Sequence, residues 1–287
     1  MVPQQSVSDK IASAFADLPR GQRQVARFII DNEYFVAFAS TAEVAGEAGV
    51  SAATVVRLCQ ALGYEGYPHL RASIRQRFHR FIPTTQRLED RLTAPIPKDD
   101  VLARAFAASI DNVKHTMGLV DRDVFQEAVD AIGQASDILV VGGGLSAAPA
   151  IFLSHSLKVM GFRVRVVTTG GIPLSLENST LQPDDLLICI GFWRYFREIV
   201  TAMRRAKEAG AAMIAITDSE VSPLAQLADH AFVATTESIG HSVSPLASIA
   251  LIDAIIAALC FERPRETLAA LRHVDAAYKE TDLLSED

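Results

Sequence analysis

The chain has 287 residues, which is enough for two ordinary domains or one large one. Apolar residues make up 49% and charged residues 21%, a balance that can build a buried core and excludes disorder of the whole chain. Acidic side chains outnumber basic ones by 34 to 27, which argues against a protein that coats nucleic acid over its whole surface. The three cysteines lie far apart with no CxxC pair, so neither a zinc finger nor a disulfide scaffold is indicated, and we expect no metal and no cofactor.

The distribution of charge divides the chain into two parts. Residues 1–80 carry nine Lys and Arg against seven Asp and Glu, whereas the remainder carries 18 against 27. A mildly basic N-terminal part followed by an acidic remainder suggests that the chain carries two separate functions. The first residues show no basic region followed by an apolar one, and the apolar stretch 243–261 has Asp253 at its centre, so it is a better buried or interface helix than a membrane span. We therefore expect a cytoplasmic protein with no membrane partner.

The first part is predicted to be helical throughout. One helix begins near Gly21, and Ser40 and Glu43 have the spacing of a capping box at the start of a short helix that Gly49 ends. A further helix follows from Ser51 to a stop at Gly63, with apolar residues at i, i+3, i+4 and i+7: Val55, Leu58, Cys59 and Leu62. Pro83, Pro95 and Pro97 then interrupt the pattern, so residues 82–100 are predicted to be a linker rather than a continuous helix.

The second part is predicted to be an α/β domain. Two helical stretches, about 98–118 and 121–134, precede short β-rich runs that alternate with helical segments, at 137–141, 163–167, 186–190, 213–216 and 230–234. Alternation of this kind predicts a doubly wound, mostly parallel five-stranded sheet flanked by helices. The expected fold is thus an N-terminal all-α helix-turn-helix domain joined to a C-terminal α/β domain.

The helices predicted at 41–48 and 51–62 have the dimensions of a helix-turn-helix. If the apolar side of the second faces the core, its other side presents Ala53, Thr54, Arg57 and Gln60. Thr54 can bond a phosphate or a base and Arg57 a guanine edge or a phosphate, while Arg71 and Arg75 are suited to neutralise phosphates. The alternative is an ordinary three-helix module in which these side chains only meet solvent.

A glycine-rich turn follows the first predicted strand, at Gly142, Gly143 and Gly144, with Ser146 just after it. A turn from a strand into a helix exposes backbone amides to an anion. A dinucleotide site would need an acidic residue at the end of the second strand, where Val167 is followed by Thr168 and Thr169 instead. We therefore expect a phosphate or another anion here, and the alternative is a turn that only permits close packing.

The run Ser51-Ala-Ala-Thr54-Val-Val-Arg57, followed by Leu62-Gly63-Tyr64 and Gly66-Tyr67, resembles the signature of RpiR-type helix-turn-helix regulators over about residues 3–80. The resemblance adds Ser51 to the candidate DNA contacts. It implies double-stranded, palindromic operator DNA as a partner and self-association, as a homodimer or homotetramer.

The second part resembles the SIS (sugar isomerase) domain over about residues 121–265. The glycine turn carries this likeness, together with Ser222-Pro-Leu-Ala225 and Ala228-Asp229 after the fourth strand. SIS domains hold a sugar phosphate with a Ser-x-Ser-Gly type loop after the third strand. This chain has Gly-Phe-Trp-Arg194-Tyr195-Phe-Arg197 there. Arg194 and Arg197 could replace the hydroxyls as anion ligands and Tyr195 could stack on a ligand, or these side chains only pair and pack.

An enzymatic role is the remaining question. Isomerases of this fold use Glu and His as acid and base, and Glu237 and His241 lie four residues apart. Such residues in a polar loop more often fix a ligand or meet solvent, so no catalytic residue is assigned, and both are candidate effector contacts. The expected organisation is a DNA-binding domain at 1–80, a linker and connecting helix at 81–120, a SIS effector-binding and dimerisation domain at 121–265, and a C-terminal helix and tail at 266–287.

The expected function is a non-enzymatic transcription regulator whose SIS domain senses a sugar phosphate or a related small anionic effector derived from sugar. The alternatives are a sugar-phosphate isomerase with an accessory helical domain, or a DNA-binding protein whose SIS body is only a dimerisation scaffold.

Overall fold

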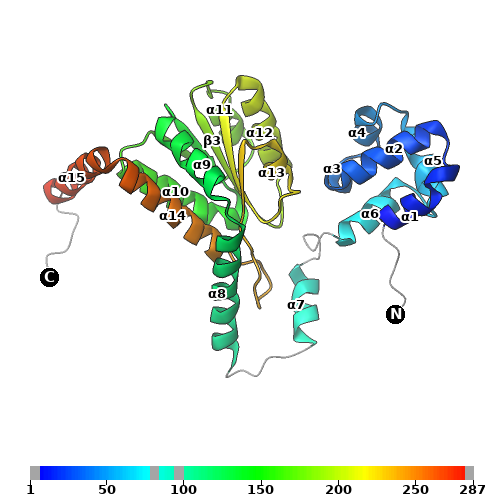
Figure 1. Ribbon diagram of the computed structural model, residues 1–287, viewed down its shortest axis with the longest axis horizontal. Helices are drawn as coiled ribbons and strands as arrows, with labels where there is room; N and C mark the ends of the chain where they lie inside the picture. Colours follow the sequence, from blue (N-terminus) through cyan, green and yellow to red (C-terminus); the bar gives the residue numbers. More distant parts are fainter. Residues whose placement is uncertain (1–6, 78–83, 94–99, 282–287) are drawn as a thin grey trace. The chain divides into compact units, whose positions relative to one another are not determined.

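The computed structural model describes residues 7–77, 84–93 and 100–281, and the chain forms two compact units, Met1–Pro83 and Thr84–Asp287 (Figure 1). The first unit is helical, as predicted. Its helices are α1 (Val7–Ala14), α2 (Arg20–Asp31), α3 (Glu33–Phe38), α4 (Thr41–Glu47), α5 (Ala52–Ala61) and α6 (Tyr67–Arg77), with a 3-10 turn at Phe15–Asp17. A single apolar cluster draws buried residues from all six of these helices.

Local chemistry sets the boundaries of α4 and α5. The Ser40 hydroxyl accepts from the Glu43 N–H and the Glu43 carboxylate accepts from the Ser40 N–H, so the predicted capping box is confirmed. Gly49 ends α4 with φ +64°, a conformation that favours glycine, and Ser51 caps α5. Gln24 of α2 reinforces the turn by donating to the Ala48 carbonyl at 2.9 Å. The two short helices are therefore held at a fixed angle by their caps and by α2.

The second unit contains five strands and nine α-helices in its described ranges. Its first helices are α7 (Thr84–Leu92), α8 (Val101–Leu119) and α9 (Arg122–Gln134), and the strands are β1 (Ile138–Val141), β2 (Val164–Val167), β3 (Leu186–Gly191), β4 (Ala212–Thr217) and β5 (His230–Val233). The remaining helices are α10 (Ala147–Val159), α11 (Ile172–Asn178), α12 (Arg197–Ala209), α13 (Pro223–Leu227), α14 (Leu246–Glu262) and α15 (Pro264–Glu280).

The segment 82–100, predicted as a linker rather than a continuous helix, contains a short helix that was not predicted. Residues 84–92 form α7, because the sequence between Pro83 and Pro95 contains no glycine or proline and is rich in residues that favour helices. The prolines bound this helix rather than break it. Of the rest of that prediction, residues 82–83 and 94–99 lie outside the described ranges.

The sheet is parallel throughout, in the order β2-β1-β3-β4-β5. Successive residues of β1 point to opposite faces, Ile138 and Val140 into one apolar cluster and Leu139 and Val141 into the other. Helices α9, α10 and α14 supply the first cluster, and α11, α12 and α13 supply the second. This is the predicted doubly wound architecture, and Figure 1 shows the two helical layers of this unit on either side of the strands.

Two features of this architecture bear on function. The strand order reverses between β1 and β3, since β2 lies on one side of β1 and β3 on the other. In doubly wound sheets ligands bind at the carboxyl ends of the strands at such a switch point. The apolar segment predicted as a buried or interface helix forms α14, whose residues Leu251, Ile252, Ile255 and Leu259 are buried against the sheet. Among the described residues, no helix has the length and apolar character that crossing a membrane requires.

Candidate functional site

The exposed side of α5 carries the residues that the sequence proposed for DNA contact. Val55, Leu58 and Cys59 are fully buried, so Ala53, Arg57 and Gln60 are exposed on the opposite side, as the helical spacing predicted. This surface runs along the second helix of the pair from its N-terminal turn, the part that a helix-turn-helix inserts into a DNA groove, to Gln60 in its last turn.

Three side chains at the start of α5 bond to one another. The Ser51 hydroxyl caps the helix through the Thr54 N–H and lies 2.9 Å from the Thr54 hydroxyl. Arg57 donates from Nη2 to the same hydroxyl at 3.4 Å. Arg57 is thereby held along the exposed side of the helix instead of extending freely, which lowers the entropy cost of a contact with DNA.

Helix α6 carries two of the arginines predicted to contact DNA, and the structure describes the side chain of Arg71 but not that of Arg75. Arg71 is half-buried, donates from Nη1 to the Ala39 carbonyl at 3.3 Å and lies against the Tyr67 ring, so part of its role is to fix the end of α3. Arg75 is on the same helix, but its side chain lies outside the described part of the chain. Tyr67 assists by donating to the carbonyls of Val36 and Ala39.

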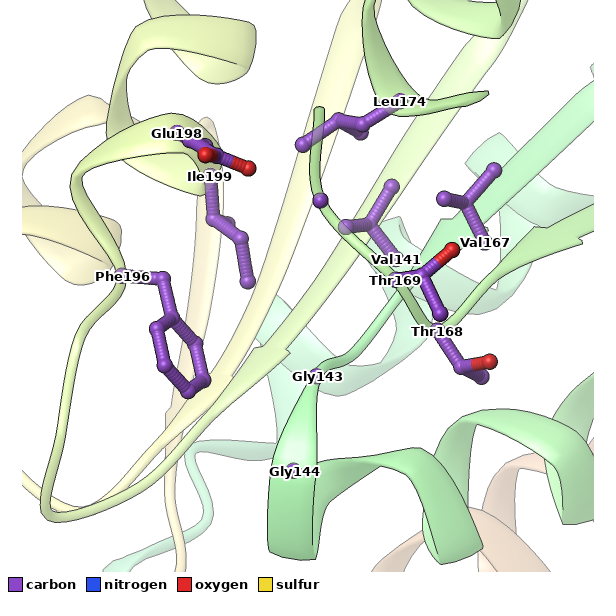
Figure 2. Close-up of a pocket in the computed structure, with 11 residues that line it drawn as sticks. Val141, Gly143, Gly144, Val167, Thr168, Thr169, Leu174, Phe196, Glu198 and Ile199 are labelled. Carbon is purple, nitrogen blue, oxygen red and sulfur yellow. The ribbon is translucent and has the colours of Figure 1, made fainter. Parts of the chain in front are cut away.

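A cavity of about 110 Å³ lies at the switch point of the sheet in the second unit (Figure 2). Gly143 and Gly144 of the predicted turn form one wall, and the ends of β1 and β2 and the start of α12 complete it. The full lining is Val141, Gly143, Gly144, Val167, Thr168, Thr169, Gly170, Leu174, Phe196, Glu198 and Ile199. The cavity confirms that the glycine turn borders a space, and its walls are mostly apolar.

Two residues that the sequence analysis missed dominate this cavity. The Phe196 ring lies against the turn, within 3.3 Å of where a side chain on Gly143 would begin. The Glu198 carboxylate accepts the Gly171 N–H at 2.7 Å and lies so close to Gly170 that a methyl group there would overlap it. Figure 2 shows both side chains beside the strand ends. Neither could be found from sequence motifs, because both reach the cavity only through the position of α12.

The rest of the glycine turn serves packing. A side chain on Gly142 would meet the Ser146 carbonyl at 2.6 Å and the Ala150 side chain at 2.9 Å, so this glycine is required for α10 to approach β1. Ser146 is buried and is not among the lining residues of the cavity. Gly142 therefore permits close packing, while Gly143 and Gly144 face the cavity.

The loop after β3 is tethered to β4 rather than to the cavity. Trp193 has φ +61°, which is rare for a residue with a side chain, and its N–H donates to Asp218 Oδ2 at 3.0 Å. Tyr195 bonds through its hydroxyl to Thr217 at 3.0 Å and to Asp218. The Arg194 guanidinium lies 4.4 Å from the centre of the Trp193 ring. Arg194 and Tyr195 are thus placed on the β4 side of the loop, away from the glycine turn.

Helix α7 contacts this loop. The Arg87 guanidinium lies 5.2 Å from the centre of the Trp193 ring. Burial lowers the pKa of the Arg87 guanidinium, and the positive charge of Arg91 lowers it further. The negative charges of Glu237 and Asp218 act in the opposite direction, so Glu237 lies near the Arg87 guanidinium. Glu237 is exposed, and its backbone pairs with the Asn112 side chain of α8. His241 is exposed on the same loop between β5 and α14.

Arg197, the first residue of α12, borders a second cavity between α11 and α12 that includes Glu198. The candidate effector residues therefore lie apart: Gly143 and Gly144 at the strand-end cavity, Arg197 at the neighbouring one, Arg194 and Tyr195 beside Trp193, and Glu237 near Arg87 of α7. The sequence placed them at one site because strand ends of a parallel sheet share an edge, but the loop conformation separates them.

Comparison with known proteins matches each of the two units to a protein family. The first matches the family model of the helix-turn-helix domain, rpiR family, over residues 5–80, and the second matches the SIS domain over residues 131–260. A helix-turn-helix unit joined to a sugar-isomerase-like unit defines a class of transcription regulator, and the helix-turn-helix unit binds DNA.

Two relatives support the same family. The chain is 26% identical over 263 residues to an uncharacterized HTH-type transcriptional regulator of Haemophilus influenzae, covering 88% of this chain and 90% of that protein. It is 40% identical to the sugar isomerase domain of an RpiR transcription factor from Sphaerobacter thermophilus, with a TM-score of 0.60, over 62% of this chain and 99% of that one. The protein belongs to the RpiR family of transcriptional regulators.

A solved structure also covers both units. The NanR protein of Vibrio vulnificus, solved in complex with ManNAc-6P, is 21% identical with a TM-score of 0.63, over 98% of this chain and 100% of that one. At this identity the likeness establishes a shared fold.

Proposed function

We propose that this regulator binds operator DNA through α5 and changes its affinity for that DNA when its SIS unit binds a small anionic carbohydrate. The observation that carries the proposal is the cavity at the switch point of the sheet, in a chain whose other unit is a DNA-binding helix-turn-helix. The corresponding regions are 1–80 for DNA binding, 81–120 for connection, 121–265 for effector binding and dimerisation, and 266–287 for the C-terminal helix and tail. A regulator of this kind would act in the cytoplasm.

In the proposed DNA complex, the exposed side of α5 enters the major groove. Ala53 allows close approach, Thr54, Arg57 and Gln60 contact base edges or phosphates, and Ser51 keeps the helix start in place. Arg71 and Arg75 contribute phosphate contacts. The bonds among Ser51, Thr54 and Arg57 support this assignment, because they fix the helix start before DNA arrives.

The proposed effector is a sugar phosphate or a sugar acid. The binding residues we propose are Gly143 and Gly144 of the turn and Arg197 at the start of α12. Of the other residues that the sequence indicated, Gly142 and Ser146 serve packing, and Arg194, Tyr195, Glu237 and His241 do not line the strand-end cavity. Support comes from the cavity at Gly143 and Gly144 and from the NanR protein of similar fold, whose structure contains ManNAc-6P. The Phe196 ring lies against Gly143 and Gly144, so it borders the space that the ligand would enter.

Sensing rather than turnover is the role we infer for the second unit. A proton transfer beside a carbonyl needs an acid and a base within hydrogen-bond reach of the substrate. Glu237 and His241 are exposed on one loop and neither is among the residues that line the strand-end cavity. Release of an isomerised sugar phosphate by the purified chain would overturn this part of the proposal.

We also propose that the second unit pairs with another copy of itself through α8 and α14. Helix α8 exposes large apolar side chains three and four residues apart, namely Leu102, Phe106, Ile110, Val113 and Met117. Beside it, a groove between α8 and α14 is lined by Val113, Met117, Ala250 and Ala254. An apolar stripe of this length on a soluble protein marks an interaction surface, and dimeric helix-turn-helix proteins read two half-sites.

The test uses the full chain and a DNA site selected by it from a random-sequence pool. DNA affinity is measured by fluorescence anisotropy at fixed salt with sugar phosphates, unphosphorylated sugars, sugar acids and small carboxylates. A compound that changes the affinity at least tenfold supports an effector-responsive regulator. If none does, the SIS unit is a dimerisation scaffold and the proposal fails.

A further inference from the structure

The cavity between α11 and α12 adjoins the strand-end cavity. It has a volume of about 170 Å³ and is lined by Gly171, Leu174, Ser175, Asn178, Arg197, Glu198, Thr201, Ala202 and Arg205. Leu174 and Glu198 also line the strand-end cavity, so the two spaces share these two side chains. A single ligand longer than either space alone could therefore occupy both.

Two arginines of α12 line the second cavity. Arg197 and Arg205 are eight residues apart with Thr201 midway, a spacing that places all three on one side of the helix. Side chains on a helix lean toward its N-terminus, so Arg205 inclines toward Thr201 and Arg197. Neither guanidinium has an ion-pair or hydrogen-bond partner among the residues that the structure describes, which leaves two cations available to one cavity.

The opposite wall, on α11, offers groups that suit hydroxyls. Asn178 is 5% exposed, and its Oδ1 is buried without a hydrogen-bond donor. A buried acceptor without a donor is unfavourable, and sites with this property are commonly completed by a ligand or water. Ser175 lies one turn earlier on the same helix and lines the cavity with it.

The strand-end cavity has the opposite electrostatic character. Glu198 is the only ionisable residue among its lining residues, and it holds its position by accepting the Gly171 N–H. A carboxylate accepts hydrogen bonds from hydroxyls but repels a phosphate or another carboxylate. Glu198 lines both cavities, but only the α11–α12 cavity offsets its negative charge with two arginines, so an anionic group is disfavoured beside the glycine turn and favoured where Arg197 and Arg205 lie.

We propose that the α11–α12 cavity, lined by Arg197 and Arg205, is the subsite for the anionic group of the effector. The hydroxyl-bearing part of the same ligand extends past Glu198 toward Thr168 and Thr169 at the strand ends. This inference rests on the proposed function and deepens it, because it assigns the ligand a polarity and replaces Arg194 with Arg205 as the partner of Arg197. The ligand class is a polyhydroxylated chain or ring with one phosphate or carboxylate at its end.

The test measures binding of inorganic phosphate to the full chain at constant ionic strength, with chloride as the balancing anion. Unfolding is followed by the fluorescence of Trp193, the single tryptophan of the chain, so the signal reports the second unit. We expect a saturable rise of the midpoint temperature with phosphate. Arg205→Gln and Arg197→Gln should each weaken phosphate binding about tenfold, the loss of one charge-assisted bond. Arg204→Gln is the matched control, since Arg204 is exposed, adjacent and not among the lining residues.

A second variant separates the subsite from general electrostatics. Glu198→Gln keeps an acceptor for the Gly171 N–H and removes the negative charge, so phosphate should bind more tightly than to the wild-type chain. The inference is overturned if phosphate gives no saturable stabilisation of the wild-type chain. It is also overturned if Arg204→Gln loses as much affinity for phosphate as Arg205→Gln, or if Glu198→Gln binds phosphate more weakly than the wild-type chain. Any of these results together with a sugar-dependent change in DNA affinity would leave the proposed function standing and refute the subsite alone.

Discussion

Asn112 of α8 joins this helix to the loop after β5, and its removal should measurably destabilise the second unit. The side chain is 3% exposed, donates from Nδ2 to the Glu237 carbonyl at 2.6 Å and accepts the Glu237 N–H at 3.1 Å. Each of the two bonds contributes about 1 kcal/mol, and groups left without a partner cost more where water cannot reach them. Alanine favours a helix by several tenths of a kcal/mol relative to asparagine. The net loss for Asn112→Ala is therefore about 2 kcal/mol.

The assay is urea unfolding of the full chain followed by Trp193 fluorescence, which reports the unit that contains α8. Lys114→Ala, an exposed change on the same helix, is the control and should alter stability by less than about 0.5 kcal/mol. A loss for Asn112→Ala no larger than that of the control would show that the two hydrogen bonds do not hold the loop, and the reasoning would fail.

Three further predictions concern the DNA surface, the thiols and the strand-end cavity. Arg57→Ala should cost about 1–3 kcal/mol of affinity for a selected site in an anisotropy titration and much less for scrambled DNA; an equal loss on both would contradict base contact. Burial raises the pKa of the Cys59 thiol to about 12 and raises that of Cys189, so both stay protonated at pH 8, and a thiol reagent should modify them only after denaturation; rapid labelling of either in the native chain would contradict their burial. Gly170→Ala should push aside the exposed end of the Glu198 side chain and break its bond to the Gly171 N–H, at a cost of about 0.5–1 kcal/mol that should largely vanish in a Glu198→Ala background, whereas additive costs in the double variant would refute the clash.

Much of the fold could be predicted from local sequence. The five strands were predicted because each is a short run of β-branched and aliphatic residues between helical segments, and their observed bounds differ from the prediction by one residue at most. The capping box at Ser40 followed from side-chain chemistry that acts within one turn. Helix α7 was missed because the prolines on either side of it were taken as a sign of linker along its whole length.

The site was less predictable, for a physical reason. The glycine turn could be found because it lies within one strand–helix connection. Glu198, Asn178 and Arg205 meet only through the packing of α11 on α12, and no sequence spacing encodes that meeting. The positive φ of Trp193, which turns Arg194 and Tyr195 toward β4, had no local signal such as a glycine.

The central claim is that a small anionic carbohydrate bound to the second unit controls DNA binding by the first. The most direct measurement is the affinity of the full chain for its selected DNA site, by anisotropy at fixed salt, with and without a saturating sugar phosphate or sugar acid taken from a thermal-shift screen. The account predicts a change of at least about tenfold, 1.4 kcal/mol of coupling between the two sites, that is lost in Arg205→Gln and retained in Arg204→Gln. An unchanged affinity in the presence of a compound that demonstrably binds the second unit would contradict it.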